Sequence, residues 1–432
     1  MVTLKAWGSG KHDDAFNRDR TNAQYEIGLA HKCARLAVLV LRRAQRYPSS
    51  EMIVSHLVLK NWRNFKRVDV ELGERVFIAG PNASGKSNFL DAFRFLRDVA
   101  KTGGVLQTAV DNRGCVSKIR CLVARVMPFI TLSVSLAENP GENPIWRYEL
   151  EFKQEAHGKK RTLINVERAW RGEELLLDRP DEEDKRDDAR LTQTSLEQIN
   201  SNRDFREVAE FLAETLYLHL VPQLVRYPDA FSGPGIPGDP FGASFLDRVS
   251  RTPARTRQSR LAKIETALRV AVPQLQALTH TTERGVPHLE ATYEHWRAKG
   301  AKQREDQFSD GTLRLIGLLW ALLERDSLLL LEEPELSVSN DIERRLPGLM
   351  FRVMRKKKRQ VLITTHSLEL LSDQGIAGEE VLLLTPSSEA TSVKVAAAIP
   401  EVRGLLNAGL PIGEAVLPRT APKNLEQLTL SS

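Results

Sequence analysis

The chain has 432 residues and an ordinary globular composition, 41% hydrophobic and 27% charged, which suits two to three domains or one large α/β domain with an inserted lobe. Of the net charge of +6, residues 1–50 contribute +5 through nine Lys/Arg against four Asp/Glu, which weakens the case for a basic nucleic-acid groove elsewhere. The longest apolar run has nine residues, too few for a membrane segment, and the first 30 residues lack a signal-peptide pattern. The three cysteines fit neither a disulfide framework nor a metal knuckle. We therefore expect a cytoplasmic protein without a membrane segment.

The predicted α/β fold begins at Met52. Residues 1–51 hold one periodic stretch, a short basic helix over 34–46, and we expect them to be an N-terminal extension that the fold can dispense with. Whether Met52 is the true start of the protein stays open. Residues 52–100 have the pattern of the first part of an α/β domain. Its predicted elements are two strands around a turn, a buried strand and an amphipathic helix, over 56–72, 74–80 and 87–99.

Residues 101–300 carry the weakest periodicity and are predicted to form an inserted lobe. The charge run 173–190 is predicted to be a solvated loop, and the Gly/Pro stretch 231–242 marks a lobe boundary. No heptad array occurs, which argues against a long coiled-coil arm. The elements predicted in this part are one hairpin and two helices, over 147–154 with 161–170, 205–220 and 260–272.

The α/β pattern returns in residues 301–400. A polar turn from Ser309 to Thr312 opens an apolar helix that runs to Glu324. From Glu401 to the end at Ser432 the sequence predicts an irregular polar tail. The other elements predicted in this part are strands at 327–331, 361–365 and 381–384, and helices at 341–355 and 368–371.

The sequence GPNASGKS, residues 80–87, fits the pattern Gly-x-x-x-x-Gly-Lys-Ser. It follows a predicted strand and opens a predicted helix, the setting in which this pattern forms a phosphate-binding loop. Backbone N–H groups and the helix N-terminus then point at phosphate oxygens. Lys86 can reach the β- and γ-phosphates and Ser87 can ligate Mg²⁺, so ATP and Mg²⁺ are the expected ligands. The residues predicted to bind nucleotide here are Gly80, Pro81, Asn82, Ala83, Ser84, Gly85, Lys86, Ser87 and Asn88.

The apolar strand 327–331 leads into two carboxylates. Glu332 stands where a Mg²⁺-coordinating acid is needed, although most nucleotidases of this type have Asp there. Glu333 is placed to polarise a water for in-line attack on the γ-phosphate. Acidic residues at strand ends are common, and the signal gains weight because a phosphate loop precedes it.

The strand VLITT, residues 361–365, ends next to His366. Ligands of α/β sheets bind at the carboxyl edge of the strands, so His366 can hydrogen-bond a γ-phosphate or the attacking water. The other histidines, His219 among them, are interpreted as ordinary polar residues. Glu333, His366 and Lys86 are therefore the predicted catalytic residues.

A phosphate loop, the turn FSDGT (308–312), a strand ending in EEPE and a strand ending in HS, in this order, resemble an ABC-type ATPase of the SMC/RecF-like class. Within that class, the sequence is most similar to the AAA/ABC-type ATPases related to the OLD proteins, over 52–100 and 300–385. The resemblance implies an α/β P-loop NTPase of the ABC-ATPase type, with an inserted α/β or helical lobe between phosphate loop and signature motif. It also implies a homodimer on ATP binding, in which Ser309 and the Gly311 N–H cap the γ-phosphate held by the other subunit.

The sequence departs from that family in several places. Asp310 stands where glycine is frequent, Thr312 replaces the usual glutamine, and Gln107 is one of several candidates for the glutamine that senses Mg²⁺. OLD-type proteins carry a nuclease domain after the ATPase, whereas the residues after the last predicted strand have no clustered Glu and Asp-x-Asp pattern. The basic cluster 355–359 is interpreted as a solvated helix end rather than a DNA contact.

Three functions compete. The first is an ATP-driven dimeric switch that acts on DNA, or on a partner effector or nuclease encoded nearby, in DNA repair or phage defence. The second is a transporter ATPase subunit, which the long segment between phosphate loop and signature disfavours. The third is a module that binds ATP without turnover, and the presence of Lys86, Glu333 and His366 argues against it.

Overall fold

The computed structural model describes residues 52–124, 127–228, 239, 241–294, 301–324, 327–355 and 359–420. Residues 49–432 form one compact unit. The predicted extension 1–51, most of the predicted boundary loop 231–242 and the middle of the basic cluster 355–359 lie outside the described residues. Within the described ranges, no helix is long and apolar enough to cross a membrane.

A six-stranded sheet in the order β15-β14-β3-β13-β12-β8 carries the phosphate loop. The strands from β14 to β8 run parallel, and β15 is antiparallel to β14. All of β3 and β13 is buried, as is usual for parallel strands covered on both faces. The carboxyl ends of β3, β12 and β13 therefore meet at one edge of the sheet. The strands are β3 (Arg75–Ala79), β8 (Leu216–Leu218), β12 (Leu329–Glu332), β13 (Val361–Thr365), β14 (Val381–Thr385) and β15 (Ser392–Val395).

A second six-stranded sheet is antiparallel, in the order β2-β1-β4-β5-β6-β7. The predicted hairpins 56–72 and 147–170 are present in it. Because β1 pairs with β4, residues from the predicted lobe 101–300 continue the sheet that begins at Ile53. The same predicted lobe also supplies β8 to the parallel sheet, so it is interwoven with the part of the fold that carries the GPNASGKS segment. The strands are β1 (Ile53–Trp62), β2 (Phe65–Glu71), β4 (Ile130–Ala137), β5 (Trp146–Gln154), β6 (Thr162–Arg171) and β7 (Glu174–Arg179).

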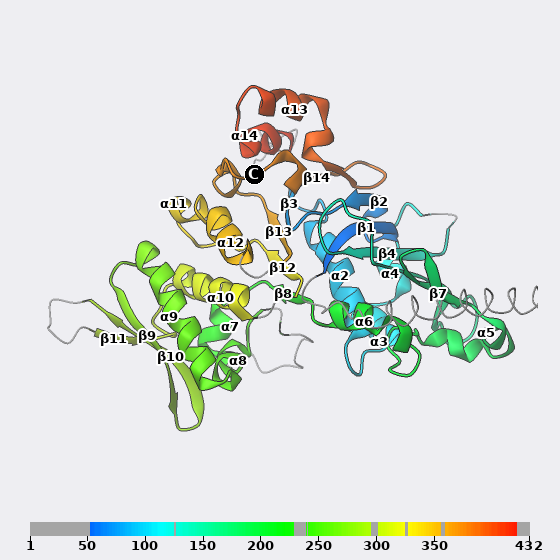
Figure 1. Ribbon diagram of the computed structural model, residues 1–432, viewed down its shortest axis with the longest axis horizontal. Coiled ribbons are helices and arrows are strands. Elements are labelled where there is room, and N and C mark those ends of the chain that lie inside the picture. The colour runs from blue at the N-terminus through cyan, green and yellow to red at the C-terminus, as the bar shows by residue number, and fades with distance from the viewer. Residues whose placement is uncertain are drawn as a thin grey trace, which may run out of the picture. The chain divides into compact units, whose positions relative to one another are not determined.

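Helices cover both faces of the parallel sheet, with α2 (Lys86–Ala100) on one side and α10 (Asp310–Glu324) and α12 (Leu346–Arg355) on the other (Figure 1). Helix α2 is buried nearly all round because it also packs on the antiparallel sheet. There the Phe95 ring lies 5.4 Å from the Trp62 ring and 5.3 Å from the Phe152 ring, measured between centroids. The phosphate loop thus sits at the head of a helix that is held between two sheets.

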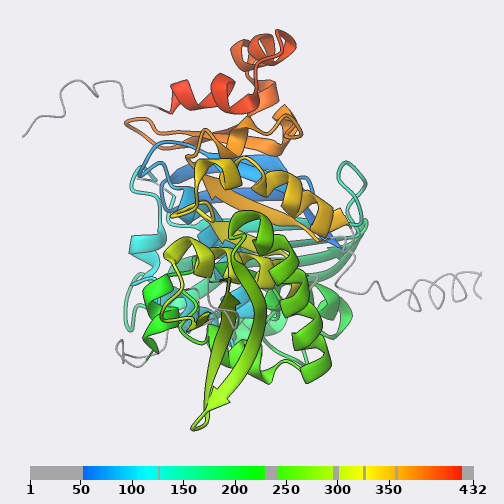
Figure 2. The ribbon, with the colours of Figure 1, turned by 90° about the vertical axis from the view of Figure 1, so that its left-hand side faces the viewer.

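A three-stranded antiparallel sheet, β11-β10-β9, packs with α8 and α9 beside α10. Figure 2 shows the β9–β10 hairpin extending as a narrow ribbon next to α9. The helix predicted over 260–272 is confirmed as part of α9. This helix begins earlier than predicted, just after Pro253, a residue type that favours helix N-termini. The elements are α8 (Phe245–Arg251), α9 (Ala254–Ala271), β9 (Leu275–Glu283), β10 (Val286–Tyr293) and β11 (Ala301–Arg304).

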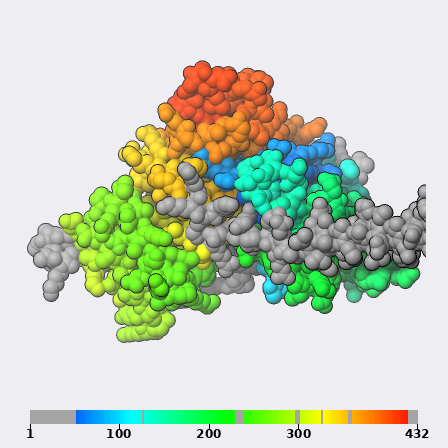
Figure 3. Space-filling model, in the orientation of Figure 1, coloured from blue at the N-terminus to red at the C-terminus, as the bar shows by residue number. Residues whose placement is uncertain are grey.

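The C-terminal segment differs from its prediction. Residues expected to be an irregular tail form α13 (Pro400–Asn407) and α14 (Ile412–Val416), which cover the orange-coloured segment that precedes them (Figure 3). Val402, Ile412 and Val416 are buried, so a few apolar side chains anchor a polar sequence. Pro400 and Pro411, next to the starts of the two helices, fit helix N-termini.

The charge run 173–190 is mostly exposed, as predicted, but it is not a loop and two of its side chains, Arg179 and Asp184, are buried. It forms β7 and α5 (Glu182–Arg186) around Arg179, whose guanidinium bonds Asp184 at 2.8 Å and Glu167 of β6 at 2.9 Å. All three side chains are buried, and the hydrogen bonds from Arg179 lower the pKa of Asp184. The charges are paired internally, which is how charged side chains tolerate burial.

Two predicted helices are interrupted. The stretch 205–220 is helical only in α6 (Arg206–Ala213), and its end forms β8. The stretch 341–355 breaks at Arg344 and Arg345, because Pro347 fits the first turn of a new helix but not a helix interior. The short helix predicted over 368–371 is a single 3₁₀ turn, 370–372. The remaining helices are α3 (Leu106–Asp111), α4 (Val116–Ile119), α7 (Pro222–Arg226) and α11 (Asn340–Glu343).

Candidate nucleotide site

The segment GPNASGKS curls between β3 and α2 in the predicted manner. Ala83 and Gly85 have positive φ angles of 61° and 98°. A Cβ on Gly80 would lie 2.6 Å from Ser84 Oγ and 2.9 Å from the Leu384 carbonyl oxygen, so no side chain fits there. The loop is therefore a tight backbone cradle at the N-terminus of a 15-residue helix.

Asn64, in the turn between β1 and β2, holds this loop in place. Its Nδ2 donates to the Ser84 carbonyl and to Thr391 Oγ1, both at 2.7 Å, and its Oδ1 accepts from Asn88 Nδ2 at 3.0 Å. A Cβ on Gly85 would collide with the Asn64 amide. Sequence reasoning did not single out Asn64, and its position in a polar turn is the only local signal.

The side chain of Lys86 lies on its own loop. Its Nζ donates to the carbonyl oxygens of Gly80 at 2.9 Å and Pro81 at 3.3 Å. Burial lowers the pKa of Lys86 from its ordinary 10.5, and the carboxylates of Glu333, Glu335 and Glu332 oppose that shift. A phosphate group in the cradle would offer Lys86 better acceptors than these two carbonyls.

Ser87 and Glu332 meet at the carboxyl edge of the sheet, as the sequence predicts for two Mg²⁺ ligands. Ser87 Oγ donates to Glu332 Oε1 at 2.5 Å. A hydroxyl and a carboxylate oxygen are the donors that Mg²⁺ accepts, and it takes its remaining ligands from phosphate and water. Among the described residues, no group of three or more His, Cys, Asp or Glu side chains could hold a metal. The Ser87–Glu332 pair would supply two oxygen ligands to Mg²⁺.

Glu333 and His366 also meet, from the ends of the adjacent strands β12 and β13. His366 Nδ1 lies 3.0 Å from Glu333 Oε1, and the Glu333 N–H donates to the Thr364 carbonyl at 3.1 Å. Glu333 has a φ of 44°, a strained value for a residue with a side chain, which turns its carboxylate out of the strand. Both side chains are partly exposed, so a water molecule can reach them.

The signature turn starts α10 within the same chain. Ser309 Oγ accepts from the Thr312 N–H at 3.2 Å, which makes Ser309 the N-cap of the helix. The departure at Asp310 is explained by Arg226 of α7, which pairs with it at 2.6 Å. A Cβ on Gly311 would lie 2.4 Å from the Ser337 carbonyl, so glycine permits contact with the segment after Glu335. Among the described residues, no hydrogen bond or ion pair joins 309–312 to 80–88 of the same chain.

Comparison with known proteins agrees with this geometry. The family model described as "AAA domain, putative AbiEii toxin, Type IV TA system" matches residues 75–372, which is more than half of the chain. The chain belongs to this AAA-domain family. The fold is that of ABC-type P-loop ATPases, because the structure of an Smc head bound to the C-winged helix domain of ScpA aligns with a TM-score of 0.52, 13% identity, and coverage of 79% of this chain and 97% of that one.

Of two further matches, one has a lower TM-score and the other covers only a short stretch of sequence. The Smc head domain with an extended coiled coil from Pyrococcus furiosus, also bound to part of ScpA, has a TM-score of 0.49 at 11% identity, over 83% of this chain and 99% of that one. Endonuclease GajA from Bacillus cereus (strain VD045) is 47% identical over 47 residues, 11% of this chain. That match spans 8% of GajA, a small part of its length.

This AAA-domain protein has a third carboxylate at the site that sequence reasoning missed. Glu335 is buried, and Thr365 Oγ1 donates to its Oε1 at 2.6 Å while its Oε2 has no partner among the described residues. Burial raises the pKa of Glu335 from 4.5 to about 6. In the sequence, Glu335 looks like an ordinary turn residue after a proline.

Glu335→Gln should change how stability depends on pH. The raised pKa means that the folded protein binds this proton more tightly than the unfolded chain, so wild-type stability falls as pH rises from 4.5 to about 6. Glutamine cannot ionise. The free energy of unfolding of the variant, relative to that of wild type, should therefore rise by roughly 2 kcal/mol as the pH increases across that window. Thermal unfolding at a series of pH values measures the gain. The exposed Glu389→Gln is the control, and a pH-independent difference for Glu335→Gln would contradict the expectation.

Gln107, one of the candidates for a Mg²⁺-sensing glutamine, bonds other residues. Its Oε1 accepts from the Thr162 N–H at 2.8 Å, and its Nε2 donates to Asp111 at 2.9 Å. These contacts tie α3 to β6. Among the described residues, no hydrogen bond connects Gln107 to the phosphate loop.

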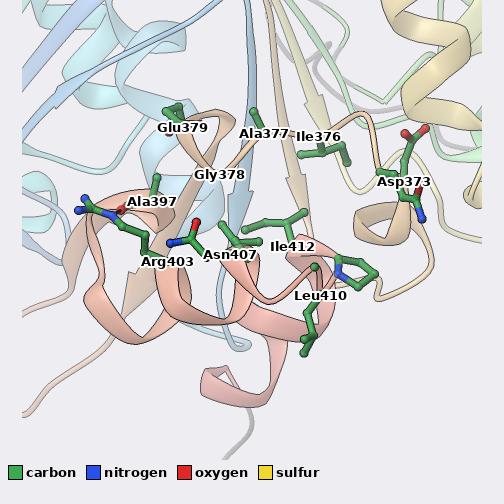
Figure 4. A pocket seen from close by; sticks show the side chains of 14 residues that line it. Asp373, Ile376, Ala377, Gly378, Glu379, Ala397, Arg403, Asn407, Leu410 and Ile412 are labelled. Atoms are coloured by element: carbon green, nitrogen blue, oxygen red, sulfur yellow. Dashed lines mark hydrogen bonds between the residues drawn. The ribbon is translucent and has the colours of Figure 1, made fainter.

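A cavity of about 720 Å³ lies in a different part of the molecule. Figure 4 shows it between the segment 373–379 and the helices α13 and α14, with Arg403 and Leu410 in its lining. No residue of the phosphate loop or of the Glu332–His366 region lines it. The cavity is therefore separate from the candidate nucleotide site.

Proposed function

We propose that this protein hydrolyses ATP with Mg²⁺ and uses ATP binding to form a dimer. The observation that carries the proposal is the Glu333–His366 pair, 3.0 Å apart, at the same sheet edge as Lys86, Ser87 and Glu332. A nucleotide-binding protein without turnover needs the cradle and the lysine, but not a carboxylate and an imidazole poised beside them.

The chemistry follows from the placement of these side chains. The phosphate-loop N–H groups and Lys86 bind the β- and γ-phosphates, and Ser87 and Glu332 would hold Mg²⁺, which would supply positive charge to the phosphoryl oxygens. Glu333 accepts a proton from the attacking water, and His366 hydrogen-bonds that water or the γ-phosphate. Contact between His366 and Glu333 keeps the carboxylate oriented before the nucleotide arrives.

In the proposed dimer, two chains pack head to tail. Ser309 and the Gly311 N–H of one chain cap the γ-phosphate bound by the other chain, as a helix N-terminus does for any anion. The pairing of Asp310 with Arg226 supports this arrangement, because it neutralises the one acidic side chain of the turn.

The proposed biological setting is action on DNA, or on a partner effector or nuclease, in DNA repair or phage defence. Support comes from the local similarity to an endonuclease and from the toxin–antitoxin wording of the family description. The identity of the target is a matter for experiment, beginning with the ATPase rate in the presence of duplex DNA and of the proteins encoded next to this one.

Phosphate release by the full-length protein tests the central proposal. Lys86→Ala removes two charge-assisted contacts to phosphate, so nucleotide affinity should fall roughly 100-fold and turnover should be lost. Lys60→Ala, at an exposed lysine of β1, is the matched control and should behave as wild type. A Lys86→Ala protein that binds and hydrolyses ATP normally would refute the proposed site.

A further inference from the structure

Each oxygen of the Glu332 side chain has a partner in this chain. Oε1 accepts from Ser87, and Oε2 accepts from the hydroxyl of Tyr217. The main-chain oxygen of Glu332 lies 3.2 Å from His219 Nδ1. Ser87 belongs to the phosphate-loop motif, whereas Tyr217 lies in the short strand β8 and His219 directly follows it. The sequence pattern predicts the end of a helix there.

Register explains how Tyr217 reaches this carboxylate. Strand β8 pairs in parallel with β12, with Tyr217 opposite Leu330. Because side chains alternate along a strand, Tyr217, Leu330 and Glu332 face the same side of the sheet, the side that α2 covers. Arg94 of α2 completes the arrangement, with its guanidinium 4.1 Å above the centre of the Tyr217 ring.

Arg94 and Tyr217 hold each other firmly. The tyrosine is 4% exposed, Arg94 is half-buried, and Arg94 Nε is buried without a hydrogen-bond partner among the described residues. A guanidinium over the face of a tyrosine ring is a favourable contact that helps to orient both groups. The phenol hydroxyl is thereby aimed at Glu332 from a rigid support.

Glutamate at this position has one more rotatable bond than the aspartate that most nucleotidases of this type use. Mg²⁺ demands near-ideal octahedral geometry, so a carboxylate that swings about an extra bond is a poor ligand unless something restrains it. We propose that Tyr217, supported by Arg94, is a positioning residue that holds Oε2 of Glu332 and leaves Oε1 to face the metal beside Ser87. This inference rests on the proposed binding of ATP with Mg²⁺.

Tyr217→Phe keeps the ring against Arg94 and removes only the hydroxyl. Losing a hydrogen bond that orients a metal ligand typically costs 10- to 100-fold in metal affinity, so the Mg²⁺ concentration for half-saturation should rise about tenfold. Binding of a fluorescent ATP analogue during a Mg²⁺ titration measures this, and Mn²⁺ binding followed by electron paramagnetic resonance gives a second readout. Affinity for the analogue in EDTA should stay within about twofold, because the phosphate loop is intact.

A double-mutant cycle separates positioning from general damage. In Glu332→Asp the carboxylate is one methylene shorter and no longer reaches the tyrosine, so adding Tyr217→Phe should change the Mg²⁺ requirement no further. Tyr148→Phe is the matched control, because it removes a buried phenol hydroxyl that donates to Glu167 in the antiparallel sheet. That control should leave the Mg²⁺ titration unchanged.

The outcomes are distinguishable. If Lys86→Ala leaves nucleotide binding intact, the proposed function fails. If Lys86→Ala abolishes binding but Tyr217→Phe has the wild-type Mg²⁺ requirement, or adds its full effect to Glu332→Asp, the positioning role is overturned. Should Tyr217→Phe fail to fold, Arg94→Met replaces it, since it removes the cation above the ring and keeps the hydroxyl. That variant should raise the Mg²⁺ requirement about threefold, and no rise would equally overturn the inference.

Discussion

Glu333→Gln should bind ATP normally, hydrolyse it at least about 1,000-fold more slowly than wild type, and accumulate as an ATP-bound dimer. The amide has the size of the carboxylate and preserves a contact with His366, but it cannot accept a proton from the attacking water. Single-turnover phosphate release measures the chemical step. Size-exclusion chromatography with ATP and Mg²⁺ measures the dimer.

Glu369→Gln is the matched control for this experiment. Glu369 lies three residues beyond His366 and pairs with Arg344. Its side chain is 23% exposed, the same fraction as that of Glu333. The Glu369→Gln substitution should therefore leave turnover unchanged. A Glu333→Gln protein that hydrolyses ATP at the wild-type rate would remove Glu333 from the catalytic role.

Ser309→Asp should abolish turnover by acting on the other subunit. Aspartate is as good an N-cap as serine, so α10 keeps its capping, but the added charge repels a γ-phosphate that approaches the helix from a second chain. Ser309→Asn caps equally well without a charge, and it should retain turnover within a few-fold of wild type. ATP binding by the phosphate loop of either variant should survive, because no hydrogen bond or ion pair joins that loop to Ser309 in the described part of one chain.

Mixing Ser309→Asp with Lys86→Ala should then restore activity. Each mixed dimer holds one site with both lesions and one site built from an intact phosphate loop and an intact signature turn. If subunits exchange freely and the sites act independently, an equal mixture of two inactive proteins should reach about a quarter of the wild-type rate. Mixing each variant with itself provides the baseline. No recovery, with both proteins folded and exchanging, would mean that Ser309 only caps its own helix.

The parts of the fold that the sequence predicted are those with local signals. The strand, loop and helix around Lys86 follow from a contiguous motif, and Glu332, Glu333 and His366 were brought together because parallel strands end at one edge. Their placement agrees with the prediction, while their catalytic roles stay proposals. The signature turn was recognised by its sequence, while its contact with a second chain stays a proposal.

What the sequence could not predict depends on distant partners. Tyr217 lies in a three-residue strand inside a helix-like pattern, and only its pairing with β12 makes it a strand. In the sequence, Glu335 is a carboxylate that follows a proline. Its burial in the core and its hydrogen bond from Thr365 are evident only in the folded protein. The burial of Arg179 and Asp184 within a mostly exposed charge run depends on Glu167, which pairs with Arg179 from another strand. In each case a tertiary contact overrides a local pattern.

The strand order of the parallel sheet has a consequence for synthesis on the ribosome. Strand β3 carries the phosphate loop, yet both of its neighbours, β13 and β14, come near the end of the chain. Gln360 likewise bonds the backbone of Val54 across 306 positions. At roughly 5–20 residues per second, the emerging β3 waits on the order of 15–60 s for a hydrogen-bonding partner. Throughout that interval Val76, Phe77 and Ile78 stand as an unpaired apolar strand, so the nascent chain should depend on a chaperone until the segment that includes His366 has left the exit tunnel.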